Sequence, residues 1–275
     1  FRRGAGFRYA AALVQNGGRP ASFTKIRLRD MLRPVNKQPD ILFYDEFLLA
    51  VDKPAGMLSI PDRYDADAPV ILNLLEKTYG KLLVVHRIDK DTSGVLLFAR
   101  DQATHKALNA LFHSRAIEKT YLALVRGRTE ADQWVCELPL LADADKLPRS
   151  IVDKRRGKEC LSRFETVERY EEYSLVRVRP ETGRTHQVRV HCAASGYPII
   201  ADPLYGDGKP LFLSKIKRGW KGDSFEERPL LARTGLHAQA LKLGHPKDGR
   251  ELDLAPPLPK DLKAAIAQLG KASSR

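Results

Sequence analysis

The sequence predicts an α+β fold built around a mixed β-sheet. Segments with strand patterns outnumber segments with helical spacing, and the two kinds do not alternate strictly along the chain. A strict alternation would instead indicate a doubly wound parallel fold. The chain has 275 residues, which suits one large domain, or one domain with a small appendage, and a stable core without disulfides.

The expected elements begin near residue 41. Apolar runs and alternation predict strands at 41–44, 47–51, 82–88, 94–99, 120–126 and 173–179. Apolar residues three and four apart predict helices at 70–79, at 101–114 with Asp101 as the N-cap, and at 261–269. Residues 139–160 indicate a loop or hairpin, and residues 206–233 a second, loop-rich insertion.

The charge is strongly positive and unevenly distributed. The chain has 47 Lys and Arg against 34 Asp and Glu, a net charge of +13. Nine of these bases and a single acid, Asp30, fall within residues 1–38. We therefore expect a basic N-terminal arm or a partial RNA-binding segment at 1–38, followed by the main domain at 39–275; a solvated basic tail is the alternative. The overall charge favours a polyanionic partner, either nucleic acid or an anionic membrane surface.

Several functional classes find no support. No apolar stretch approaches the roughly 18 to 20 residues that a membrane span needs. The three cysteines are too few and too scattered for a disulfide framework, so they indicate free thiols in a reducing compartment. The sequence contains no phosphate-binding loop ending in Lys-Ser/Thr, no dinucleotide fingerprint and no Gly-x-Ser-x-Gly motif.

The most unusual stretch is residues 83–94. A fully apolar strand is expected to deliver His86, Arg87 and Asp89 at its end, where a rigid scaffold presents reactive groups. Asp89 should stay ionised because Arg and Lys stand beside it. The alternative interpretation is an ordinary turn, since Asp and Ser are common turn residues.

A second basic stretch lies at residues 181–192. It is either a strand or a helix capped at Thr185. Its two arginines, Arg184 and Arg189, suit a phosphate or carboxylate partner. A zinc site at His186, His191 and Cys192 is the weaker interpretation because no matching ligand pair lies elsewhere. A surface-exposed basic helix is the structural alternative.

Three further segments look structural when taken singly. Tyr121 lies in the apolar strand 119–125, where a tyrosine is usually part of the core. Residues 198–206 and 53–56 are rich in turn residues, although Lys53 could alternatively contact a phosphate.

Taken together, these stretches resemble one family. HRIDKDTSG at 86–94 resembles the HRLD-x-x-TSG motif of the RluA family of RNA pseudouridine synthases. Further blocks match in the family's order: KPAG at 53–56, KTYLALV at 119–125, TGRTHQVRVHCAASGYPIIADPLYG at 182–206, and LHA at 236–238. The resemblance covers residues 41–254 and implies a mixed, largely antiparallel central sheet flanked by helices. Ile88 and Cys192 depart mildly from the pattern without changing its charge.

The resemblance implies an isomerase that converts uridine in structured RNA to pseudouridine after flipping the base out, with no metal and no cofactor. By resemblance, Asp89 is the catalytic carboxylate and Arg189 pairs with it. Tyr121 is expected against the flipped base, as a candidate for the final deprotonation, and Leu236 against its other face. Arg87 is expected either to fill the vacated stack or to contact the displaced strand. The expected substrate-binding set also includes His86, Thr92 and Arg184.

The RNA target is not specified by these motifs. We expect ribosomal RNA, with transfer RNA as the alternative, and a monomeric, cytoplasmic protein that does not bind membranes. Two other functions remain open at this point. One is a catalytically silent RNA-binding module on the same scaffold. The other is a metal-dependent RNA hydrolase that uses His186, His191 and an aspartate.

Overall fold

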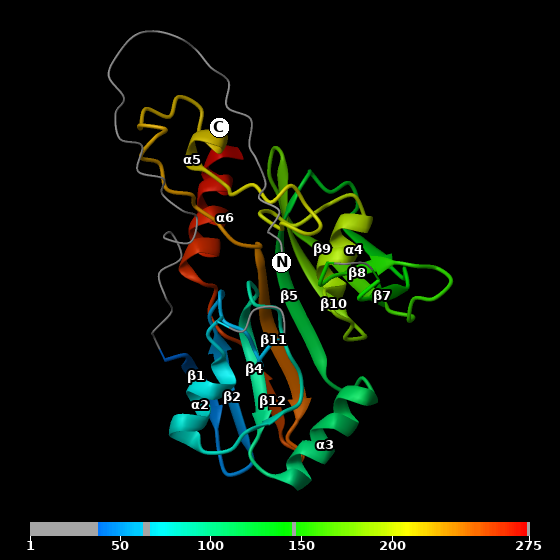
Figure 1. Cartoon of the computed structure of the whole chain (residues 1–275). Helices are drawn as coiled ribbons and strands as arrows, with labels where there is room; N and C mark the ends of the chain where they lie inside the picture. The colour runs from blue at the N-terminus through cyan, green and yellow to red at the C-terminus, as the bar shows by residue number, and fades with distance from the viewer. Residues whose placement is uncertain (1–37, 63–66, 145–146, 274–275) are drawn as a thin grey trace, which may run out of the picture. The chain divides into compact units, whose positions relative to one another are not determined.

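The computed structural model describes residues 38–62, 67–144 and 147–273 and confirms the α+β class (Figure 1). A ten-stranded sheet follows the order β1-β2-β4-β11-β5-β10-β9-β6, with β12 beside β11 and β3 beside β4. Among the described strands, β4 and β11 pair in parallel, and all other pairs in this sheet are antiparallel. The predicted basic arm at 1–38 lies outside the described residues, apart from Gln38.

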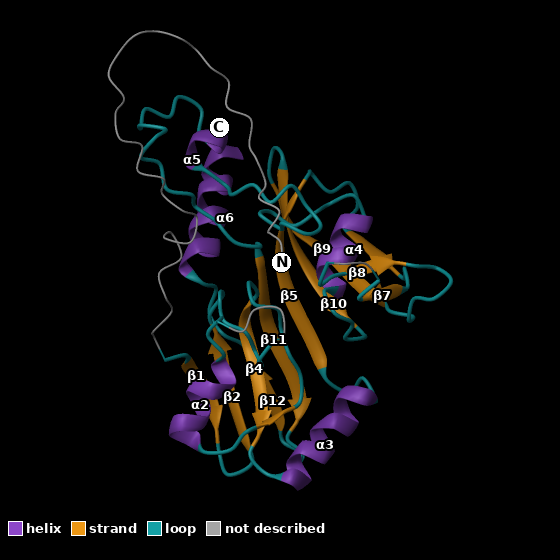
Figure 2. Cartoon of the chain, viewed as in Figure 1, coloured by secondary structure: helices purple, strands orange, loops and turns teal. Residues whose placement is uncertain are grey.

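The structure assigns these bounds to the elements (Figure 2). The strands are β1 (Asp40–Tyr44), β2 (Leu48–Lys53), β3 (Leu83–Val84), β4 (Ser93–Ala99), β5 (Glu118–Arg126), β6 (Gln133–Cys136), β7 (Leu140–Ala142), β8 (Ser150–Val152), β9 (Ser162–Arg169), β10 (Tyr173–Pro180), β11 (Leu236–Gly244) and β12 (Glu251–Leu254). The helices are α2 (Ile71–Tyr79), α3 (Gln102–His113), α4 (Gln187–Ala194), α5 (Leu213–Ile216) and α6 (Lys260–Ser273).

In one half of the sheet, alternate side chains of β2 and β4 pack against two helices, α2 on one face and α3 on the other. On β2 and β4, Leu49, Val51, Leu96 and Phe98 are buried in the cluster that contains α2. The residues between them, which include Leu48, Ala50, Val95 and Leu97, are buried in the cluster that contains Leu108 of α3. This is the period-two pattern expected of strands that are covered on both faces.

In the other half of the sheet, alternate side chains of β5 also pack against two different helices. Leu122 and Leu124 are buried with residues of α6, whereas Ala123 and Val125 are buried with residues of α4. Tyr121 shares the face of Ala123 and contacts both the α3 cluster and the α4 cluster. Helices α3 and α4 therefore cover one face of the sheet at two separate places, and Tyr121 lies between them.

The predicted strand at 82–88 is mostly wrong. Only Leu83 and Val84 pair with β4, and the chain then leaves the sheet. Side chains take over the hydrogen bonds that a neighbouring strand would have made. His86 Nε2 accepts the backbone N–H of Leu97, and the Ser59 hydroxyl bonds both the N–H and the carbonyl of Ile88. Side-chain hydrogen bonds therefore hold this segment beside the sheet although it forms no strand.

Other expectations are confirmed. Helix α3 begins after Asp101, whose carboxylate accepts the N–H of Thr104 at 2.9 Å. The hairpin expected within 139–160 is the pair β7 and β8. All three cysteines are buried and free. Among the described residues, no helix has the length and apolar character to cross a membrane.

Gly94 sets the spacing of the one parallel pair. Its φ angle is +118°, and a Cβ at this position would overlap the backbone of Ala238 on β11. We expect Gly94→Ala to lower the free energy of unfolding by at least about 3 kcal/mol, because two central strands would have to separate. Urea unfolding measures this loss.

Gly196→Ala is the matched control. Gly196 also has a positive φ, +88°, and ends α4 in the left-handed conformation, with its N–H bonded to the Ala193 carbonyl, but a Cβ there meets nothing within 4 Å. Its loss should be about 1 kcal/mol, the cost of the left-handed backbone alone. Equal losses at the two positions would contradict the close approach of β4 and β11.

Candidate active site

A cavity of about 770 Å³ lies where Tyr121 separates α3 from α4. Its walls come from residues 85–92, α3, the start of β5, residues 180–189 and the start of β11. The structure brings every site residue named from the sequence into this one cavity: His86, Arg87, Asp89, Thr92, Tyr121, Arg184, Arg189 and Leu236. Segments more than 140 residues apart in the chain thus meet at one place.

Asp89 is presented by a tight turn after the irregular segment. The backbone N–H of Thr92 donates to the Asp89 carbonyl at 3.1 Å, which closes the turn. Ser59 holds the preceding residue, Ile88, through both of its backbone polar groups. The Asp89 side chain is 19% exposed, so its carboxylate can be reached from the cavity.

Lys53 holds the same turn through a backbone carbonyl, that of Lys90. Its ammonium is completely buried and donates to the carbonyls of Pro54, Met57 and Lys90 at 2.9, 2.7 and 3.1 Å. The Gly56 N–H also donates to the Lys90 carbonyl, at 2.8 Å. Burial lowers the pKa of Lys53 to about 7. The alternative of a phosphate contact at Lys53 is therefore wrong, because three backbone carbonyls already enclose its ammonium.

Arg233, which lies just before β11, also holds this turn. One guanidinium nitrogen donates to the Asp91 carbonyl at 3.2 Å and to the Leu236 carbonyl at 3.1 Å. The other two nitrogens bind the carboxylate of Asp261, at the start of α6, at 2.8 and 3.0 Å. One arginine thus connects the Asp89 turn to the strand that carries Leu236.

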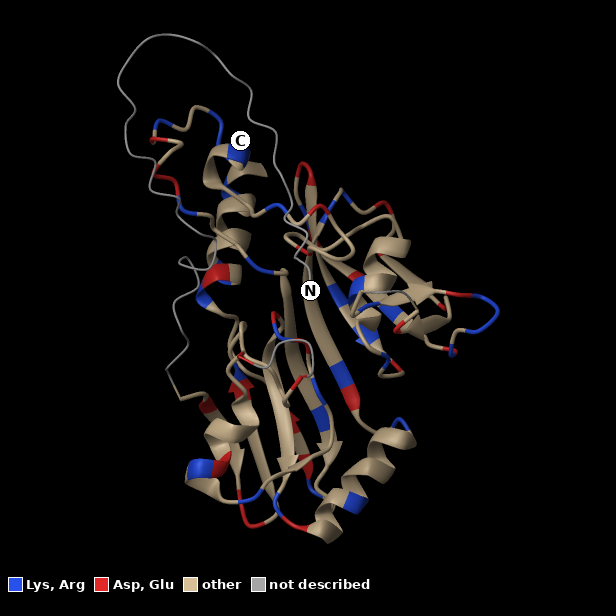
Figure 3. Ribbon diagram, in the orientation of Figure 1, with Lys and Arg blue, Asp and Glu red and all other residues tan. Residues whose placement is uncertain are grey.

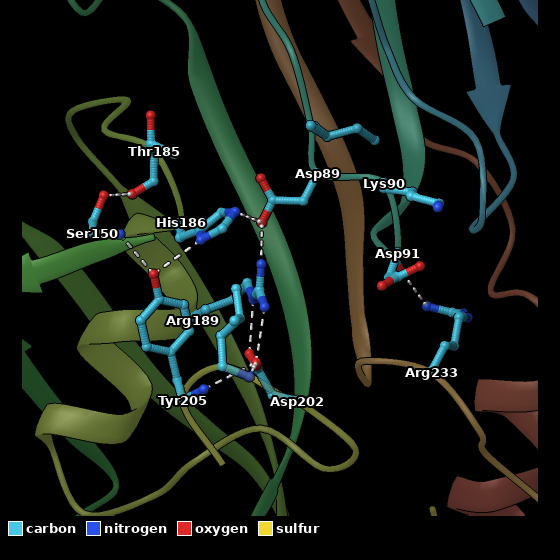
Figure 4. A network of polar contacts seen from close by, with 12 residues as sticks. Asp89, Lys90, Asp91, Ser150, Thr185, His186, Arg189, Asp202, Tyr205 and Arg233 are labelled. Carbon is cyan, nitrogen blue, oxygen red and sulfur yellow. Dashed lines mark hydrogen bonds and ion pairs between the residues drawn. The ribbon is translucent and has the colours of Figure 1, made fainter. Parts of the chain in front are cut away.

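Arg189 lies between two aspartates (Figure 4). Its Nε and Nη2 bind both oxygens of Asp202 at 2.7 and 2.8 Å, in the paired geometry that suits a guanidinium and a carboxylate. Its Nη1 donates to Asp89 Oδ2 at 3.2 Å. The Arg189 side chain is only 8% exposed. Asp202 therefore fixes the guanidinium, and the fixed guanidinium holds one oxygen of Asp89.

Asp202 is a site residue that the sequence analysis missed. Its side chain has no exposed surface, and besides Arg189 it accepts the backbone N–H groups of Leu204 and Tyr205. Burial alone would raise the pKa of this carboxyl, but the bonds from Arg189 and the backbone outweigh burial and lower it. The sequence did contain a signal for Asp202, because Asp202 lies in the block 182–206 that resembles the family. The turn around it, 198–206, was interpreted as structural.

His186 is the second partner of Asp89. Its Nε2 lies 3.8 Å from Asp89 Oδ2, and its Nδ1 lies 2.9 Å from the hydroxyl of Tyr205. Tyr205 Oη also accepts the backbone N–H of Ser150 on β8, at 2.9 Å. Figure 4 shows the Arg189 and His186 contacts reaching the same Asp89 oxygen. Asp89 Oδ1 is thus the oxygen directed away from both partners.

Tyr121 and Leu236 form the floor of the cavity. They lie on adjacent strands, β5 and β11, and Leu236 is almost completely buried. Burial raises the pKa of Tyr121 above its ordinary value of 10, and the charge of Asp89 raises it further. Tyr121 is therefore a neutral phenol at physiological pH. This argues against a phenolate base, the form in which a tyrosine most readily removes a proton.

The remaining expected residues differ in how deeply they lie in the cavity. Thr92 is buried in the wall, and the ring of His86 lies 5.0 Å from that of Phe112. Burial lowers the pKa of His86 to about 3, so His86 is a neutral hydrogen-bond acceptor for Leu97. Arg87 and Arg184, in contrast, are exposed at the cavity rim.

Further cations surround this rim. Arg115 and Lys119 also line the cavity, and Lys119 donates to the Thr182 carbonyl at 2.9 Å. Burial and the nearby charge of Arg115 lower the pKa of Lys119 to about 8. Figure 3 shows Lys and Arg on the strands beside the cavity, including β5 and β10. The cavity therefore has a cationic rim around a carboxylate.

Within the stretch 181–192, residues from Gln187 onward form helix α4, but three expectations for the stretch are wrong. The N-cap of α4 is His186 rather than Thr185, and residues 187–192 are all buried, so the helix is not a surface-exposed one. The zinc interpretation also fails, because the ring nitrogens of His191 bind Ser162 Oγ and the Leu138 carbonyl. The described residues contain no group of three or more His, Cys, Asp or Glu suited to a metal ion.

Comparison with known proteins identifies the family. Residues 47–194 match the family model described as RNA pseudouridylate synthase. The chain is 34% identical over 223 residues to the dual-specificity RNA pseudouridine synthase RluA of Vibrio vulnificus, covering 79% of this chain and 82% of that protein. It is 36% identical over 232 residues to the ribosomal large subunit pseudouridine synthase C of Haemophilus ducreyi, covering 83% and 68%.

The fold agrees with this assignment. The human protein RNA Pseudouridylate Synthase Domain Containing 4 superimposes with a TM-score of 0.65 at 24% identity, covering 84% of this chain and 93% of that one. The chain therefore belongs to the RNA pseudouridylate synthase family and is an RNA pseudouridine synthase, an isomerase that acts on RNA.

Proposed function

We propose that Asp89, held by Arg189, carries out the isomerisation on a uridine flipped into the cavity, with Tyr121 in contact with the reacting base. The observation that supports this most strongly is the Asp202–Arg189–Asp89 arrangement, in which a carboxylate is held by a buried guanidinium yet stays accessible. The cavity volume, about 770 Å³, falls within the range of roughly 300 to 1,000 Å³ typical of small-ligand sites. A flipped nucleotide is a ligand of this class.

The reaction rearranges bonds within the RNA. The bond between uracil N1 and ribose C1′ breaks, and a bond between uracil C5 and C1′ forms. The proton that leaves C5 is balanced by the proton that N1 gains. No atom or electron enters or leaves overall, so the protein has to supply a carboxylate, a shaped cavity and a path for one proton.

Asp89 acts in this scheme as an ionised carboxylate on the ribose. A carboxylate can attack C1′ or remove the C2′ proton, and both routes need it deprotonated and correctly oriented. Arg189 supplies the charge that keeps it ionised and fixes its Oδ2. Oδ1 is then the oxygen that approaches the sugar.

The other residues bind the nucleotide. Uracil lies against Tyr121 on one face and Leu236 on the other, as their place on the cavity floor allows. Arg87 and Arg184, exposed at the rim, contact the phosphates or the displaced strand. His86 and Thr92 shape the wall next to Asp89.

Ribosomal RNA is the substrate class that we propose. Both bacterial relatives act on RNA according to their names, and one of those names specifies the large ribosomal subunit. The net charge of +13 suits a large folded RNA, which proteins bind mainly through phosphates and shape. The basic segment 1–38 would add contacts outside the catalytic domain at 39–275.

We also propose a monomer acting in the cytoplasm. The described residues of one chain form a cavity that contains the whole expected site, as a monomeric enzyme requires. The three free cysteines fit a reducing compartment.

Asp89→Asn tests the catalytic assignment. We expect pseudouridine formation on bulk RNA to fall by more than roughly 1,000-fold, because the amide can neither attack the ribose nor remove its proton. RNA affinity in a filter-binding assay should stay within about twofold. Asp91→Asn, in the same turn but outside the cavity lining, is the control and should keep its activity within a few fold. Wild-type turnover by Asp89→Asn would exclude Asp89 from the chemistry.

Pseudouridine mapping of total RNA tests the target. Cells that lack the gene should lose one or more pseudouridines from ribosomal RNA, and a plasmid copy should restore them. A plasmid carrying Asp89→Asn should not restore them, since it binds RNA without converting it. Loss of pseudouridine from transfer RNA alone would contradict the ribosomal assignment.

A further inference from the structure

His186 ends a chain of hydrogen bonds that leads to Asp89. The backbone N–H of Ser150 donates to Tyr205 Oη, and Tyr205 Oη contacts His186 Nδ1, each at 2.9 Å. His186 Nε2 then faces Asp89 Oδ2 at 3.8 Å. Ser150 is itself tied to the backbone next to His186, because its hydroxyl donates to the Thr185 carbonyl at 2.7 Å.

The Tyr205 hydroxyl can select the tautomer of His186. A phenol has one proton to donate, and accepting the Ser150 N–H does not use it. The Tyr205 hydroxyl and His186 Nδ1 lie at hydrogen-bond distance, and either atom can be the donor. When the phenol donates, Nδ1 is unprotonated, and a neutral imidazole carries its proton on Nε2, the nitrogen that faces Asp89.

The surroundings keep this imidazole neutral. Burial lowers the pKa of His186, and the positive charges of Arg189 and Arg87 act in the same direction. The negative charges of Asp89 and Asp202 oppose them without reversing the shift. The Tyr205 ring packs edge-on against the His186 ring at 5.6 Å.

The backbone at His186 is also unusual. His186 has a φ of 55°, the left-handed region that non-glycine residues seldom adopt. This conformation costs roughly 1 to 2 kcal/mol. Such strained positions concentrate at functional sites. Here the strained residue is the one whose ring points at the candidate catalytic carboxylate.

We propose that His186 is a positioning residue that donates its Nε2 proton to Asp89 Oδ2 when RNA is bound, and that Tyr205 sets the tautomer that makes this possible. The inference rests on the proposed role of Asp89. Catalytic hydrogen bonds are often long before the substrate binds, so the present 3.8 Å is a starting distance. With Arg189 and His186 both on Oδ2, the carboxylate cannot rotate, and Oδ1 stays directed at the ribose.

Tyr205→Phe tests this inference through its pH dependence. The variant keeps the ring but removes the proton that holds Nδ1, so a neutral His186 can turn a lone pair toward Asp89. At about pH 8 we expect kcat to fall roughly tenfold, with KM for RNA within about twofold. Burial holds the pKa of His186 below the ordinary value of about 6.5, so protonation restores the Nε2 proton only at pH values below that. The deficit should therefore be smaller at pH 5.5 than at pH 8.

Tyr197→Phe is the matched control. Its hydroxyl also accepts a backbone N–H, from Glu130, but Tyr197 does not line the cavity. This variant should have the wild-type rate at both pH values. A Tyr205→Phe rate equal to wild type, or a deficit that is the same at both pH values, would overturn the inference. The second outcome is what a purely structural role for Tyr205 predicts.

A measurement that does not depend on activity completes the test. Long-range proton–nitrogen NMR spectra of histidine-labelled protein should show His186 protonated on Nε2 in the wild type and a mixture of tautomers in Tyr205→Phe. His186→Asn assigns the signal, and asparagine tolerates the left-handed backbone. An Nδ1-protonated His186 in the wild type would overturn the inference. If Asp89→Asn were active, the proposed function would fail instead, whatever the His186 spectra showed.

Discussion

The buried ion pair between Arg189 and Asp202 is the interaction on which the site depends. Both side chains are buried, and removing one partner of such a pair typically costs about 3 to 5 kcal/mol. Asp202 is in turn fixed by two backbone N–H groups. The guanidinium therefore has one available orientation, and the Asp89 carboxylate is held by a group that does not move. Catalysis gains from this arrangement because orientation is set before RNA arrives.

Residues from three separate parts of the chain hold Asp89 and its turn in place. Lys53 and Ser59 hold the turn from β2 and the loop after it, Arg233 holds it from the side of α6, and Arg189 reaches it from α4. Two of these contacts, those of Lys53 and Arg233, use charged groups to hold backbone carbonyls rather than side chains. The backbone of the turn is thereby held while the Asp89 side chain stays accessible to the cavity.

Local pattern predicted much of the sheet but not the site. Alternation located β5 and β10, and Asp101 located the start of α3, because these signals act within a few residues. The strand expected at 82–88 failed because side chains from elsewhere, Ser59 among them, replace the ladder bonds. Local pattern singled out His86, Arg87, Asp89, Arg184 and Arg189 as candidates, but their roles, and the choice of Thr92, Tyr121 and Leu236, came from resemblance to a family. Asp202 and Tyr205 were missed because their roles appear only when the turn at 202–205 folds back onto α4.

Arg189 acts on Asp89 by geometry as well as by charge. Arg189→Lys tests it, because lysine keeps the charge but cannot bind Asp202 through two nitrogens while reaching Asp89 with a third. Steady-state kinetics on the RNA substrate should show kcat reduced roughly 100-fold, with KM within about twofold. A raised KM with kcat retained would contradict the account and make Arg189 a phosphate contact.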